Sequence, residues 1–222
     1  MPTKQQLQAS HVYAALMEEI KIRIAAIDAG TGGLLPHPAA IVREHCFLQI
    51  RFICELVALG CLVAHGDIKA TQAGRIRKQW AADKIMDDLT ALHPNFYPMP
   101  TKRERTDSGF AVEPIASPLP KTELIKLYRK CGGVLHRGSL KSLLSQKAPI
   151  QIHYPDITAI AQKFIDLLST HLVIMQGGEM IFLCTLHNID DNRKVQVVIA
   201  ETKILLEPPK PARGRALAHE AE

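Results

Sequence analysis

The chain has 222 residues, which is enough to bury a hydrophobic core without help from disulfides. Its 47% hydrophobic content with only 5% aromatic residues favours packed helices, and the net charge of +5 is compatible with a nucleic-acid partner. The five cysteines form no CxxC pair and no Cys/His cluster at zinc spacing. We therefore expect no metal site, no disulfide framework and no cofactor, and the simplest location is a reducing cytoplasm.

Helical periodicity predicts a first helix over residues 3–28 and a second over residues 39–65. The second is apolar around most of its circumference, as a central bundle helix would be, yet it carries Arg51 and Glu55 near its middle. Two charges there argue against a membrane span, so we expect no membrane association. Because isolated buried charges are costly, this polar pair must be satisfied internally or by a polar site.

A third helix is predicted over residues 71–92, and its first turns carry basic residues beside Trp80. Residues 93–120 follow, with six prolines and the charged run TKRERTDSG, and they are interpreted as a flexible loop, a lid or an insertion. Cations near rings could hold nucleic acid, although a solvated helix face and an ordinary loop explain them equally well. The candidate nucleic-acid contacts are Arg75, Arg77, Lys78, Lys102, Arg103 and Arg105.

A fourth helix should begin near Lys121 and a fifth should fill residues 154–176. Two β-branched runs around residues 189–192 then predict a hairpin, which must pack on the bundle or pair with another chain to be stable. The expected fold is all-α, an up-and-down helical bundle with a small C-terminal β-hairpin. Its parts are a bundle domain at 1–176, a hairpin appendage at 177–206 and a disordered tail at 207–222.

The stretch YRKCGGVLHRGS places Arg129 and His136 seven positions apart, which on a helix returns them to one face two turns apart. That face lies away from the predicted apolar stripe, which comprises Leu124, Leu127, Tyr128, Cys131, Val134 and Leu135. A second series through Ile125, Arg129, Gly132 and His136 has the spacing of a helix contact seam. The seam suggests a homodimer formed through the helix at 121–143.

An arginine, six intervening residues and a histidine on a late helix of such a bundle resemble the HEPN superfamily. Its catalytic members are metal-independent endoribonucleases whose motifs face one another across a dimer interface. The resemblance implies that His136 is the general acid or base and that Arg129 binds the scissile phosphate. It also implies a supporting role for Arg51 and Glu55, products ending in a 2′,3′-cyclic phosphate, and a toxin or antiviral-defence role with a protein inhibitor.

Other interpretations stay open at this stage. The Arg/His pair could serve an interface without turnover, and the glycines between them could end the helix. A non-catalytic HEPN-like bundle could bind a nucleotide or a protein partner, and a purely structural helical adaptor would do neither.

Overall fold

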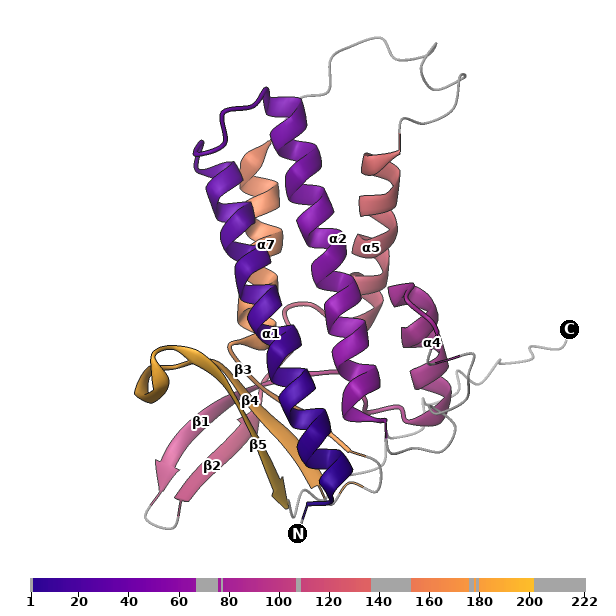
Figure 1. Ribbon diagram of the computed structural model, residues 1–222, viewed down its shortest axis with the longest axis vertical. Helices are drawn as coiled ribbons and strands as arrows, with labels where there is room; N and C mark the ends of the chain where they lie inside the picture. The colour runs from indigo at the N-terminus through magenta and orange to yellow at the C-terminus, as the bar shows by residue number, and fades with distance from the viewer. Residues whose placement is uncertain are drawn as a thin grey trace, which may run out of the picture.

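The computed structural model describes residues 2–66, 76, 78–106, 109–136, 153–175, 178 and 180–201, with no side chains given for 105–106 and 109–110. Within them lie five α-helices, named α1 (Lys4–Thr31), α2 (Ala39–Ala64), α4 (Ala82–Leu92), α5 (Lys121–Leu135) and α7 (Tyr154–Leu168). The strands are β1 (Met99–Thr106), β2 (Gly109–Pro114), β3 (Thr170–Ile174), β4 (Met180–Asn188) and β5 (Lys194–Glu201). The four longer helices stand side by side, and the sheet lies across the end where α1 begins and α7 ends (Figure 1).

The two N-terminal helices form where the periodicity predicts them. Thr3 and Gln6 close a capping box at the start of α1, and Gly32 is its C-cap, as the glycine-rich stop indicates. Helix α2 is buried on several sides, which confirms its central place in the bundle. Its length and composition would suffice to cross a membrane, and 56% of its most apolar window of 18 residues is buried within this fold.

The predicted all-α fold is wrong. The molecule is mixed α/β, with a five-stranded antiparallel sheet in the order β2-β1-β3-β4-β5. The predicted hairpin exists as β4 and β5, but it forms part of this sheet and is not a small appendage. The proline-rich segment at 93–120 supplies β1 and β2, so its prolines and charges did not prevent regular structure.

The predicted fifth helix also needs correction. Helix α7 ends at Leu168, and Thr170–Ile174 forms β3, the central strand of the sheet. Four of the five residues of β3 are buried. The strand therefore lacks the alternation of apolar and polar residues by which a sequence distinguishes a strand from a buried helix.

A buried hydrogen bond joins the sheet to α1. The Tyr13 hydroxyl donates to Nε2 of His171 at 2.7 Å, while Nδ1 of His171 donates to the Leu168 carbonyl at 2.9 Å. His171 has no exposed surface, and burial lowers its pKa to about 4. The imidazole is therefore neutral at physiological pH and serves as a packed polar link between helix and sheet.

Candidate functional site

Helix α5 has a buried side and a charged side. Leu124, Leu127, Tyr128 and Cys131 are buried, which confirms the core of the predicted stripe. The outward side is formed by residues that alternate in steps of four and three, the spacing of one helix face. These exposed residues are Thr122, Lys126, Arg129, Gly133 and His136, with Lys130 exposed beside them.

The charged pair of α2 lies behind α5. Arg51 Nε is 3.2 Å from Glu55 Oε1, and Arg51 Nη2 donates to the Tyr128 hydroxyl at 2.8 Å. The arginine thus has a partner on its own helix and another on α5. These partners offset the cost of placing a charge in an apolar helix, as the sequence predicted. Burial raises the pKa of the Tyr128 phenol, the Arg51 guanidinium opposes this, and the Glu55 carboxylate adds to the rise, so the net shift is upward. The phenol therefore stays protonated and tied to this pair.

The two glycines of α5 face different surroundings. A Cβ at Gly132 would lie 3.3 Å from Arg51 Nη1, so Gly132 leaves room for the arginine of the same chain. Gly132 therefore faces α2 and not the outward side, so the predicted contact seam, which joined Gly132 to Arg129 and His136, does not lie on one exposed face. A Cβ at Gly133 would meet nothing within 4 Å, so the space above the charged side is open there.

The predicted catalytic pair lies at the outer side and end of α5. Arg129 is 62% exposed, and its Nη2 approaches Asp83 Oδ2 of α4 at 3.5 Å. An ion pair this exposed and this long holds its arginine weakly. The helix continues through both glycines to Leu135, and His136 is its exposed C-cap with an extended backbone. Both side chains are thus accessible from solvent. The shared helical face was predicted to include His136, but the helix ends one residue before it.

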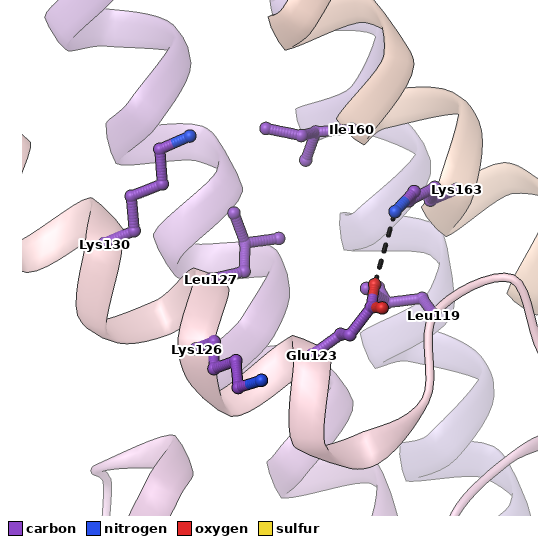
Figure 2. A pocket seen from close by; sticks show the side chains of 7 residues that line it. All are labelled: Leu119, Glu123, Lys126, Leu127, Lys130, Ile160 and Lys163. Carbon is purple, nitrogen blue, oxygen red and sulfur yellow. Dashed lines mark hydrogen bonds and ion pairs between the residues drawn. The ribbon is translucent and has the colours of Figure 1, made fainter.

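A groove of about 320 Å³ separates α5 from α7, next to this charged side. Leu119, Leu127 and Ile160 supply its apolar lining, and it is rimmed by charged side chains. Figure 2 shows Lys130 reaching over it from α5, and a Glu123–Lys163 ion pair of 3.3 Å bridging the two helices. The remaining rim lysine is Lys126. Since one carboxylate stands against three ammonium groups, the rim attracts anions.

The other predicted nucleic-acid contacts do not join this surface. Lys102 and Arg103 are exposed on β1, in the β1–β2 hairpin, which lies at the far end of the molecule from α5 (Figure 1). Lys78 is exposed just before α4. Arg75 and Arg77 lie outside the described residues, as does the side chain of Arg105. The described cations therefore form separate patches, and the patch on α5 lies beside a groove.

Sequence reasoning missed the acidic partner of Arg129 and the lysines around the groove. Asp83 precedes Arg129 by 46 residues, and only the packing of α4 beside α5 brings them together. Lys126 and Lys130 could have been identified from the sequence, because two cations four residues apart and away from an apolar stripe predict a basic helix face. Lys163 comes from a different helix, and no local pattern places it beside them.

Within the described residues, no group of three His, Cys, Asp or Glu side chains is arranged to hold a metal ion. All five cysteines are free and buried, and burial raises the pKa of Cys131 to about 12. No family model matches the chain, and comparison with the curated proteins and with the solved structures found no match.

Proposed function

We propose that this chain binds RNA through its phosphate backbone along the outward side of α5, and that Arg129 and His136 are the candidate cleavage pair of a metal-independent endoribonuclease. The observation that carries the proposal is a stripe of exposed cations, Lys126, Arg129 and Lys130, beneath the open space at Gly133. Phosphate binding by Lys and Arg supplies most of the sequence-independent affinity of proteins for nucleic acid.

The charges on this side are available for a ligand. Among the described residues, neither Lys126 nor Lys130 has an acidic partner, and the Lys130 Nζ lies 5.9 Å from the centroid of the Phe47 ring. Arg129 can exchange its weak contact with Asp83 for a bidentate contact with phosphate, which is the geometry that a guanidinium favours. The groove beside them has an apolar lining that can accept the edge of an unstacked base.

The chemistry follows from the residue types. A ribose 2′-hydroxyl attacks the adjacent phosphorus and the bond from phosphorus to the 5′-oxygen breaks, leaving a 2′,3′-cyclic phosphate and a 5′-hydroxyl. The His136 imidazole can take the proton of the 2′-hydroxyl or give one to the departing oxygen. Arg129 can stabilise the charge that develops on the phosphate. No step requires a metal, and the reaction class is the one that the resemblance to the HEPN superfamily implies.

Homodimerisation through the helix at 121–143 remains a prediction, because only its part up to His136 lies in the described residues. A second α5 placed against the outward side would oppose like charges. An RNA strand between the two helices would neutralise them, which is compatible with a shared site.

The test is to incubate purified wild type with RNA in EDTA and to analyse both fragments and their ends. We expect fragments with 2′,3′-cyclic phosphate ends from wild type and intact RNA from His136→Ala and from Arg129→Ala. Both variants should keep the circular dichroism spectrum and melting temperature of wild type, since both side chains are exposed. Bound but intact RNA in all three samples would refute cleavage and leave a non-catalytic RNA-binding bundle, which is the alternative function.

A further inference from the structure

The two edges of the sheet differ in how well they are protected against pairing with another strand. On β2, six residues long, Pro114 removes one backbone donor and Glu113 adds a charge. Strand β5 has eight residues, no proline, and a core of small and apolar side chains from Val195 to Ala200 interrupted only by Gln196. Natural sheets usually block such an edge with charge, proline or a bulge, because it can pair with another chain.

The open backbone groups of β5 can be assigned from one contact. The amide of Val195 donates to Glu18 of α1 at 2.6 Å and therefore points away from β4. Antiparallel pairing alternates along a strand, so Val197 and Ile199 also direct their amides and carbonyls to the free edge. Helix α1 satisfies the start of this edge, since Lys21 binds the carbonyl of Arg193 as well. Among the described residues, none hydrogen-bonds the outward backbone groups of Val197 and Ile199, and these two positions form the open part of the edge.

The side chains along this open part suit a second copy of the same strand. Val198 is 43% exposed on the side of the sheet opposite α1. Antiparallel pairing of two β5 strands about a two-fold axis at Val198 places Val198 opposite its own copy, and Val197 opposite Ile199 of the second copy. Gln196 then faces Ala200 of the second copy. In this register the central pairs are apolar and no like charges oppose each other.

A groove on the α1 side offers the room that this pairing needs. It has a volume of about 390 Å³ and lies between the first half of α1 and β5. Val197 and Ile199 line it together with Leu7, which is 46% exposed, and Ala14. In the register about Val198, the Val197 and Ile199 side chains of the second copy lie on this same side of the sheet and can fill the groove.

We propose that two copies of this chain pair through β5, antiparallel about Val198, to form one continuous ten-stranded sheet. This inference does not depend on RNA binding, because the edge of β5 and the outward side of α5 belong to different elements of the fold (Figure 1). It gives the chain a dimer contact that leaves the charged side of α5 free.

The first test is disulfide cross-linking at the symmetry axis. Facing residues of a pair without hydrogen bonds have Cα atoms about 4.5 Å apart, within the range that a disulfide spans. Val198→Cys should therefore give a covalent dimer on mild oxidation. Gln196→Cys is the matched control, because the two copies of position 196 would lie about 13 Å apart along the strands. The native cysteines are buried and do not interfere.

The second test needs no oxidation. Light scattering after size-exclusion chromatography should give a dimer mass for wild type and for Gln196→Lys. Val198→Lys should be monomeric, because it opposes two like charges at the axis, while its circular dichroism spectrum stays that of wild type. A monomeric wild type, a Val198→Lys chain that stays dimeric, or equal cross-linking at positions 196 and 198 would each overturn the proposal. A dimeric Val198→Lys chain would instead favour the predicted dimer contact through the helix at 121–143.

Discussion

The buried His171 makes the stability of this fold depend on pH in a way that one substitution can isolate. Its imidazole is neutral in the fold with a pKa of about 4, whereas an unfolded histidine has a pKa near 6.5. Below pH 6.5 the unfolded chain takes up a proton that the folded chain does not. The free energy of unfolding therefore falls as the pH drops from 6.5 to 4, and the contribution of His171 is complete above pH 6.5.

The magnitude follows from the difference of 2.5 between 6.5 and about 4. At about 1.4 kcal/mol for each pH unit, the loss attributable to His171 is about 3 kcal/mol between pH 6.5 and 4. His171→Gln removes the titrating group but keeps an acceptor for the Tyr13 hydroxyl. The variant should be less stable than wild type at pH 7, and the difference between them should shrink as the pH falls.

Urea unfolding at pH 7, 5.5 and 4 measures this difference directly. The control is His37→Gln, which replaces an exposed histidine and leaves His171 and its link to Tyr13 in place. If the stability curves of wild type and His171→Gln run parallel from pH 7 to 4, the description of His171 as a buried neutral imidazole bonded to Tyr13 is wrong.

Two further predictions test the packing of α5 on α2. Glu55→Ala should lower the free energy of unfolding by about 2 kcal/mol because it leaves the Arg51 charge unpaired, and adding Arg51→Met should recover part of this loss in denaturant melts. Gly133→Ala should stabilise the fold by up to about 1 kcal/mol, because it adds helix propensity in open space. Gly132→Ala should fall short of that gain, because its methyl group crowds Arg51; equal gains at both glycines in thermal melts would contradict the placement of α5.

The helices could be predicted from the sequence because their apolar residues recur at helical spacing. Tyr13, Met17, Ile20, Ile24 and Ile27 are buried along α1, as a periodic stripe requires. The charged pair of α2 was likewise predictable, since a burial cost demands a partner and the i, i+4 spacing provides one.

Beyond the predicted hairpin of β4 and β5, the strands of the sheet could not be predicted, for two different reasons. In β1 the run KRER carries charges on both sides of the strand, so no alternation of apolar and polar residues marks it. In β3 the run HLVI is buried on both sides, so it continues the apolar pattern of α7 without a visible change of period. Each strand becomes recognisable only through its neighbours in the sheet, and these come from distant parts of the chain.

The exposure of the candidate residues was predicted from the sequence, and their surroundings were predicted less well. Arg129 and His136 are accessible, as the motif requires, but Gly132 faces Arg51 and not a second chain. The contact of Arg129 with Asp83 depends on how α4 packs against α5, and the groove depends on α7. Spacing along one helix carries no information on such contacts between helices.

The most direct test of the central claim is the salt dependence of RNA binding. Fluorescence anisotropy in EDTA would compare wild type with Lys126→Ala/Lys130→Ala, using a short labelled single-stranded 2′-O-methyl RNA that lacks the attacking 2′-hydroxyl and stays intact. A matched control with the same change of charge is Lys102→Ala/Arg103→Ala on the β1–β2 hairpin. We predict that the α5 variant binds more weakly. The slope of log affinity against log salt, which is negative, should become less steep by about 1.4, the value for two lost phosphate contacts on a single strand. Wild-type affinity and slope in the α5 variant, or their loss in the hairpin variant instead, would contradict an RNA-binding surface on α5.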